Sequence, residues 1–210
     1  MRNAAVPLKI LAICGSIRVG SMNRRLLDAA TELAPAGMSL RFADSLDSIP
    51  LFSEDREHAA AQGFDAVQRL RAQVAHADGI LIATPEYNQS IPGVLKNAID
   101  WLSRPLPDEV LIGKPVAVIG ASAGRWGTRL AQAALRQVLF ATESPVLPLP
   151  TLYVREAAQL FDAQGSLVDA STRESLVAVL QAFARWIELL PHPGAAPRTT
   201  ALAADVPVTA

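Results

Sequence analysis

The chain has 210 residues, half of them hydrophobic, and a formal net charge of -1 at pH 7. This length suits one domain with a full core, and the near-neutral charge gives no electrostatic reason to expect nucleic acid or an anionic membrane as partner. No apolar run approaches the roughly 18 residues needed to span a bilayer, and the short N-terminal segment leaves no room for a signal peptide. We therefore expect a cytoplasmic protein whose one cysteine, Cys14, is a packed small apolar residue and not a nucleophile.

Apolar runs alternate with amphipathic stretches along most of the chain. The pattern predicts strands over residues 8–14, 39–43, 79–84 and 115–120, with a short edge strand inside the proline-containing segment 144–154. Apolar residues at helical spacing predict helices over residues 24–33, 64–74, 94–102, 130–138 and 176–190.

This alternation predicts an α/β fold in which a five-stranded parallel sheet is covered by helices on both sides. We expect the doubly wound strand order 2-1-3-4-5, which places a ligand site at the carboxyl ends of strands one, three and four. One domain is expected over residues 1–190. Residues 191–210, rich in alanine, proline and threonine, are expected to form a flexible tail.

The loop at residues 15–23 carries the most specific signal in the chain. It leads from a buried strand into a helix, where unpaired backbone N–H groups and the positive end of the helix dipole favour an anion such as phosphate. Ser16, Ser21 and Asn23 add short donors. Arg18 adds a planar cation that can bind two phosphate oxygens. Helix capping by Ser21 or Asn23 is the simpler alternative, although it accounts for only one of these donors.

Two common phosphate-binding motifs are missing from this loop. Gly-x-x-x-x-Gly-Lys-Ser/Thr is absent, which argues against a nucleoside triphosphate held with magnesium. Gly-x-Gly-x-x-Gly is also absent, which argues against close approach to a dinucleotide pyrophosphate. A hydroxyl-lined loop instead favours a terminal monophosphate.

Two further loops should lie at the same edge of the sheet. Residues 85–93 follow the third strand and contain Tyr87, with Pro92 placed for the first turn of the next helix. Residues 121–128 follow the fourth strand and contain Trp126. A planar, mostly apolar ring fits between such loops, because backbone N–H groups can meet its polar edges and an aromatic side chain can close one side. Ordinary packing of the two aromatic residues is the alternative.

Two motifs in these loops resemble a known family. Residues 15–23 read Gly-Ser-x-Arg-x-x-Ser-x-Asn, and residues 85–101 read Pro-Glu-Tyr-Asn-x-Ser-x-Pro-Gly-x-Leu-Lys-Asn-Ala-x-Asp-Trp. Both are similar to NAD(P)H-dependent FMN reductases, which include quinone and chromate reductases, and the likeness runs from about residue 8 to residue 190. The resemblance implies a three-layer flavodoxin-like fold, FMN as cofactor and NADPH or NADH as co-substrate. It assigns the FMN phosphate to Ser16, Ile17, Arg18, Ser21, Met22 and Asn23, and the flavin ring to Pro85, Glu86, Tyr87, Asn88, Ser122 and Gly124.

The resemblance also implies an activity. Hydride would pass from the nicotinamide to the flavin and on to a quinone-like, azo, metal-oxyanion or free-flavin acceptor, with no side-chain acid or base required. Relatives are usually dimers or tetramers, and Glu86 either lines the site or, as we prefer, forms an ion pair across a subunit contact. Many relatives have Gly-Gly where this chain has Gly127 and Thr128, so Thr128 bears on how closely the third loop approaches the flavin or the nicotinamide.

Two other functions remain open. Residues 120–124 match Gly-x-Ser-x-Gly, the nucleophile elbow of hydrolases, with Ser122 as nucleophile and a triad completed by Asp162 or Asp169 and His192. His192 lies between two prolines beside the predicted tail, which is a poor position for a catalytic base. A flavin-binding electron carrier or regulator without turnover is the second alternative. The near-neutral charge disfavours the carrier, because electron carriers of this fold usually present a strongly acidic docking surface.

The remaining histidines point to no further chemistry. His58 and His76 have no metal-ligand spacing, so we expect surface or helix-capping roles for them and no metal site. The choice between NADPH and NADH, and the physiological acceptor, stay open at this stage.

Overall fold

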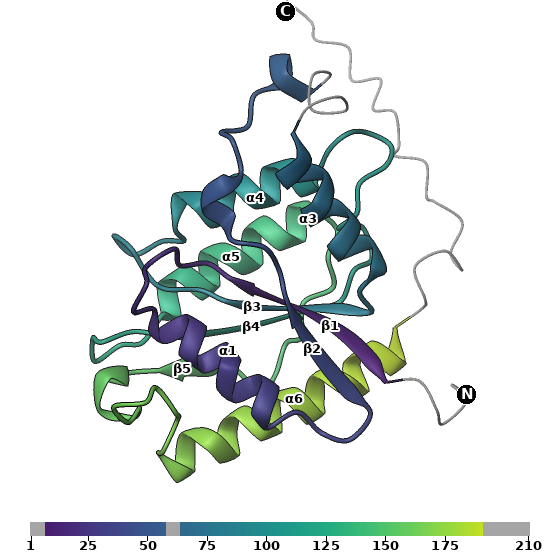
Figure 1. Cartoon of the computed structure of the whole chain (residues 1–210). Helices are drawn as coiled ribbons and strands as arrows, with labels where there is room; N and C mark the ends of the chain where they lie inside the picture. Colours follow the sequence, from purple (N-terminus) through teal and green to yellow (C-terminus); the bar gives the residue numbers. More distant parts are fainter. Residues whose placement is uncertain (1–6, 58–63, 191–210) are drawn as a thin grey trace, which may run out of the picture.

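The computed structural model describes residues 7–57 and 64–190, and a five-stranded sheet lies at its centre (Figure 1). Neighbouring strands are all parallel, and the strand order is β2-β1-β3-β4-β5. The strands are β1 (Leu8–Cys14), β2 (Met38–Phe42), β3 (Gly79–Ala83), β4 (Val116–Ala121) and β5 (Leu152–Val154). The predicted α/β class and strand order are therefore confirmed, including the short edge strand in the proline-containing segment.

Helices cover both faces of the sheet (Figure 1). One face carries α1 (Met22–Glu32) and α6 (Ala170–Leu189), and the other carries α3 (Asp65–His76), α4 (Gly93–Leu102) and α5 (Arg129–Ala141). Each face has its own apolar core, because the strands bury side chains on both sides. Short 3-10 helices occur at Leu46–Ser48 and Ala157–Gln159 in the connecting segments.

The strand order brings three loops to one edge of the sheet. β1 pairs with β2 on one side, where Leu8 lies opposite Met38, and with β3 on the other, where Ile10 lies opposite Gly79. In a doubly wound sheet the connections diverge at this switch point, and the loops after the neighbouring strands frame a ligand. The loops after β1, β3 and β4 all reach the left-hand edge in Figure 1.

Three local predictions differ from the structure. α1 begins at Met22, two residues before the predicted start, because Ser21 serves as its N-cap. Pro92 is the N-cap residue of α4 and does not lie inside its first turn. Leu130, which we expected on the apolar stripe of α5, is half exposed, and the buried face of that helix is formed by Ala131, Gln132, Leu135 and Leu139.

Part of the sequence-based expectation lies beyond what the structure covers. The predicted tail at 191–210, together with His58 and His192, falls outside the described residues. Within residues 7–57 and 64–190, no helix combines the length and apolar character needed to cross a bilayer.

Candidate functional site

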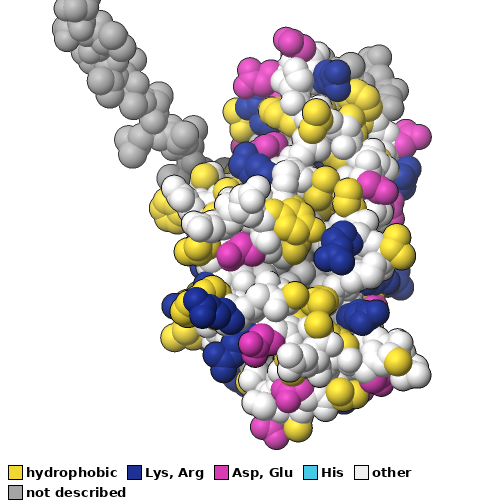
Figure 2. Space-filling model, turned by 90° about the vertical axis from the view of Figure 1, so that its left-hand side faces the viewer, with side chains coloured by type: hydrophobic (Ala, Val, Ile, Leu, Met, Phe, Trp, Pro, Cys, Tyr) yellow, Lys and Arg dark blue, Asp and Glu magenta, His cyan; other side chains and the backbone are white. Residues whose placement is uncertain are grey.

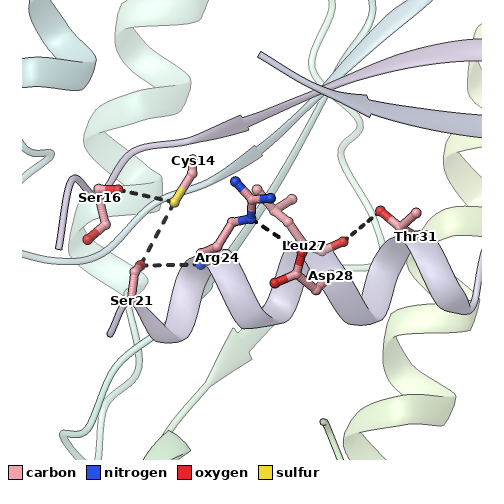
Figure 3. A network of polar contacts seen from close by, with 7 residues as sticks. All are labelled: Cys14, Ser16, Ser21, Arg24, Leu27, Asp28 and Thr31. Atoms are coloured by element: carbon pink, nitrogen blue, oxygen red, sulfur yellow. Dashed lines mark hydrogen bonds and ion pairs between the residues drawn. The ribbon is translucent and has the colours of Figure 1, made fainter. Parts of the chain in front are cut away.

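Short side chains hold the first loop, which joins β1 to α1 (Figure 3). The Oγ of Ser21 accepts a hydrogen bond from the N–H of Arg24 at 3.2 Å and so caps the helix. The thiol of Cys14 donates to the carbonyl of Ser16 at 3.3 Å and lies 3.8 Å from Ser21 Oγ. Cys14 also packs against the core, as predicted. Both the predicted cap and the structural role of the cysteine are confirmed.

The start of α1 keeps unpaired main-chain donors. In the described part of the chain, the N–H groups of Met22 and Asn23 have no hydrogen-bond acceptor, as expected for the first turn of a helix. The side chains of Ile17 and Arg18 are exposed on the preceding loop, and the N–H of Arg18 bonds to Ser16 Oγ at 3.4 Å. Free N–H groups, a helix dipole and an exposed guanidinium together fit a phosphate group.

The side chain of Asn23 is engaged elsewhere. It is buried, its Nδ2 donates to the carbonyl of Ala121 at 2.9 Å, and its Oδ1 accepts from the N–H of the same residue at 2.8 Å. Asn23 can therefore contact an anion only through its main chain. Its side chain instead ties the start of α1 to the end of β4, a link that the sequence pattern did not indicate.

The second loop, between β3 and α4, contains a tight hairpin. Tyr87 and Ser90 exchange two main-chain hydrogen bonds of 3.0 Å each, and the two residues between them, Asn88 and Gln89, have φ values of 50° and 63°. Positive φ at both central positions is the signature of a type I′ turn, which asparagine tolerates better than most residues. The loop is therefore stiff, and it presents the half-exposed side chain of Tyr87 at the edge of the sheet.

Glu86, in the same loop, caps α5. Its Oε2 accepts hydrogen bonds from the N–H groups of Leu130 at 2.9 Å and Ala131 at 3.0 Å. The contact lies within one chain. The carboxylate therefore has two partners at a helix N-terminus, and the expected ion pair across a subunit contact stays a prediction.

The third loop, between β4 and α5, is fixed by hydrogen bonds where it leaves the sheet and is exposed at its tip. Ser122 Oγ accepts from the N–H of Gly124 at 3.0 Å, and the N–H of Ser122 donates to Val154 of β5 at 2.9 Å. At the tip, the guanidinium of Arg125 lies 4.9 Å from the ring of Trp126, which is 64% exposed. Trp126 is thus available to a ligand and does not belong to the core.

Thr128 does not project from this loop. Its side chain is completely buried, and its Oγ1 accepts a hydrogen bond from Nε2 of Gln132 at 3.1 Å. A Cβ on Gly120 would collide with Thr128 Oγ1 and with the carbonyl of Thr84, so the missing side chain of Gly120 makes the space that Thr128 fills. The Thr128 side chain therefore faces the core and not the outer surface of the loop.

The hydrolase alternative lacks its geometry. A nucleophile elbow places the serine on a sharp, strained turn between strand and helix. Here Ser122 follows β4, but α5 begins only at Arg129. Asp162 and Asp169 are also engaged, the first by the N–H groups of residues 164 and 166 and the second as the N-cap of α6.

His76 has the capping role expected of it. One ring nitrogen lies 2.7 Å from the carbonyl oxygen of Ala72, four residues earlier, at the C-terminal end of α3. Within residues 7–57 and 64–190, no three His, Cys, Asp or Glu side chains gather in a way that could hold a metal ion.

Figure 2 looks onto the edge of the sheet that these three loops share. Hydrophobic side chains gather near the middle of this face, with lysine and arginine side chains beside them. The exposed large apolar residues of the three loops are Ile17, Val19, Tyr87 and Trp126. An apolar surface next to cations and free N–H groups suits an aromatic ligand that carries a phosphate.

Comparison with known proteins identifies the ligand chemistry. The family model described as NADPH-dependent FMN reductase matches residues 8–159, which include all three loops. The chain belongs to this family. It is therefore a flavodoxin-like FMN protein that depends on NAD(P)H, as the two loop motifs predicted.

Curated members of the family match almost over their full length. The chain is 48% identical over 184 residues to an NAD(P)H-dependent FMN reductase of Pseudomonas aeruginosa, covering 87% of this chain and 97% of that protein. It is 41% identical over 181 residues to a 2-hydroxy-1,4-benzoquinone reductase of a Burkholderia species, covering 86% and 96%. A solved structure, the flavoenzyme NAD(P)H:(acceptor) oxidoreductase FerB of Paracoccus denitrificans, superposes with a TM-score of 0.79 at 35% identity, covering 86% of this chain and 97% of FerB.

Proposed function

We propose that this family member is an FMN-dependent NAD(P)H oxidoreductase that reduces quinone-like acceptors. Each turnover would take two electrons and one proton from NAD(P)H as hydride and, with one further proton, convert a quinone to a hydroquinone. The main support from the structure is the meeting, at one edge of the sheet, of an unblocked α1 N-terminus and two loops that border an apolar surface. Azo compounds, metal oxyanions and free flavin are further acceptors that an exposed flavin ring would admit.

The first loop would hold the FMN phosphate. We assign this role to the main-chain N–H groups of Met22 and Asn23 and to the Arg18 guanidinium. The hydroxyls of Ser16 and Ser21 and the main chain of Ile17 would complete the phosphate site. Ser21 Oγ accepts the N–H of Arg24 and lies 3.8 Å from the sulfur of Cys14, so its O–H would exchange that weak contact for a phosphate oxygen. Charge-assisted hydrogen bonds of this kind are about twice as strong as neutral ones.

The second and third loops would hold the ring. Main-chain groups of Pro85, Glu86 and Asn88 and the side chain of Tyr87 would meet one side, with Ser122 and Gly124 approaching from the third loop. When bound, FMN would supply the hydride-transfer chemistry between NAD(P)H and the acceptor. The residues of this chain would orient the ring, leave one face open to the nicotinamide and place donors at the ring edge that becomes more negative.

Steady-state kinetics test this proposal. The protein, loaded with FMN, freed of excess flavin and kept anaerobic, should turn over NADPH or NADH repeatedly only when a quinone such as benzoquinone is added. Double-reciprocal plots at several quinone concentrations should be parallel, because both substrates would use the same open ring face in turn. Absence of FMN-dependent turnover with either nucleotide and with quinone, azo dye and free flavin as acceptors would contradict the proposal.

We also propose that the protein is a cytoplasmic homodimer or homotetramer. A surface groove of about 390 Å³ lies between α4 and the C-terminal half of α5, and the exposed apolar side chains of Leu106 and Ile112 line it. Phe140 on α5 is exposed as well. Exposed apolar side chains at a groove favour contact with a second copy, and sedimentation at micromolar concentration would report the assembly.

A further inference from the structure

Glu86 joins two of the loops that frame the proposed flavin site. It belongs to the loop after β3, yet its carboxylate binds the first turn of α5, which begins immediately after the loop that follows β4. Both hydrogen bonds reach the same oxygen, Oε2, from the N–H groups of Leu130 and Ala131. The partners lie 44 and 45 residues away in the chain, so this is a tertiary contact and not a local turn.

α5 depends on this carboxylate because its own N-cap residue contributes no side chain. Thr128 makes no capping hydrogen bond, and its hydroxyl points inward to Gln132. The first N–H groups of a helix have no partners within the helix, and here a carboxylate from another loop supplies an acceptor. It also places a negative charge at the positive end of α5. The first turn of α1 thus keeps free donors, while the N-terminus of α5 is occupied.

The position of Glu86 is transmitted to its neighbours. Tyr87 and Ser90 close a two-residue turn with mutual hydrogen bonds, so the residues that follow Glu86 move as one unit. On the other side, Pro85 has a fixed φ, and its carbonyl accepts from the hydroxyl of Thr84 at 2.8 Å. Anchoring Glu86 to α5 therefore sets where this whole loop stands relative to the loop after β4.

We propose that Glu86 is a positioning residue for the flavin ring, which sets the separation of the two ring-binding loops by capping α5. The inference rests on the proposed FMN site and adds a prediction to it. The Glu86 carboxylate would affect how the ring is held and not how the phosphate is held at α1. Loss of the carboxylate should therefore lower the affinities for FMN and for riboflavin, which lacks the phosphate, by the same factor.

The test compares two helix-cap truncations. Glu86→Ala removes the cap of α5. Asp169→Ala removes the N-cap of α6, because Asp169 Oδ2 accepts a hydrogen bond from the N–H of Thr172 at 2.8 Å. Both variants lose a helix cap, but only Glu86 adjoins the ring loops. Dissociation constants for FMN and riboflavin are measured by quenching of flavin fluorescence. Glu86→Ala should weaken both ligands by on the order of tenfold, whereas Asp169→Ala should leave both within about twofold of wild type.

A conservative variant separates positioning from general destabilisation. Glu86→Gln keeps one carbonyl oxygen that can accept both N–H groups, so it should restore both affinities to within about threefold of wild type. The proposal is overturned if Glu86→Ala binds both flavins normally, if it weakens FMN alone, if Asp169→Ala weakens them equally, or if Glu86→Gln is as weak as Glu86→Ala. Failure of wild type to bind either flavin would instead contradict the proposed function itself.

Discussion

Asn23 and Ala121 form a closed pair of hydrogen bonds between the first turn of α1 and the last residue of β4. The two residues are 98 positions apart, and the amide of Asn23 satisfies both the N–H and the carbonyl of Ala121. This pair fixes the proposed phosphate loop relative to the loop that carries Ser122. It assigns the Asn23 side chain to the framework of the site, while its main-chain N–H remains available to the ligand.

Replacing Asn23 with leucine should destabilise the apoprotein. The side chain keeps a similar size, but both main-chain groups of Ala121 lose this partner in a buried position. We expect the free energy of unfolding, measured by urea denaturation, to fall by about 1–3 kcal/mol. Leu26→Ala, at a fully buried apolar position of the same helix, provides a scale, because it should cost about 2–5 kcal/mol through cavity formation. An Asn23→Leu variant as stable as wild type would show that the pair contributes nothing net.

Gly120→Ala should be strongly destabilising for a different reason. The new methyl would collide with the Thr128 hydroxyl and with the Thr84 carbonyl, and the second of these is main chain that cannot rotate away. Overpacking of this kind costs about 1–3 kcal/mol. Adding Thr128→Ala should recover only part of the loss. Gly93→Ala is the control, since a Cβ there meets nothing within 4 Å, and it should leave the unfolding midpoint almost unchanged.

Arg18→Ala should lower the affinity for FMN and leave the affinity for riboflavin unchanged. Arg18 is exposed on the loop that leads into α1, and a hydrogen bond to a charged group contributes about 1.5–3 kcal/mol. This corresponds to roughly a 10- to 150-fold increase in the FMN dissociation constant. Arg41→Ala, which removes an exposed arginine on β2, should alter neither affinity. Equal losses of affinity for FMN and riboflavin would show that Arg18 binds the ring and not the phosphate.

Trp126→Ala should act on the substrates and not on FMN retention. The indole is 64% exposed at the tip of the third loop, where it can stack on a nicotinamide or quinone over the open ring face. Aromatic contacts contribute about 0.5–1.5 kcal/mol beyond burial, so KM for one or both substrates should rise roughly threefold to tenfold. Phe140→Ala, at a still more exposed aromatic position on α5, is the control. Unchanged KM values would remove Trp126 from the substrate site.

The stability of the protein at acid pH should depend on the ionisation of Asp169, the N-cap of α6. Hydrogen bonds from the hydroxyl and N–H of Thr172 lower the pKa of the Asp169 carboxyl below its ordinary value of 3.8. Because the folded-state pKa is depressed, the stabilisation is complete above pH 3.8 and is lost as the pH falls through the lower folded-state value. The difference in unfolding free energy between wild type and Asp169→Asn should therefore shrink only at acid pH. A difference that is constant down to complete protonation would contradict this linkage.

The sequence was informative wherever a pattern is local. The apolar runs predicted the strands and their order, because buried parallel strands and amphipathic helices each have a recognisable period. Ser21 could be expected as a helix cap from its place just before the helix. The loop motifs predicted the family, which the comparisons confirm.

The sequence was uninformative wherever the partner of a polar group is far away in the chain. The positions of Glu86 and Asn23 give no sign that one caps α5 and the other binds Ala121, because these contacts exist only once the sheet has formed. Thr128 precedes a helix, as a capping residue would, yet its side chain turns inward to the space that Gly120 leaves. The exposure of Leu130 likewise depends on the orientation of α5 about its own axis against the sheet, which helical spacing alone does not determine.

One anaerobic measurement tests the central claim most directly. The protein is loaded with a single equivalent of FMN, freed of excess flavin and mixed with a stoichiometric amount of NADPH or NADH while the visible flavin absorbance is followed. We predict that the absorbance bleaches with at least one of the nucleotides and returns when a quinone is added. Failure to retain FMN, or a retained flavin that neither nucleotide bleaches, would contradict the account.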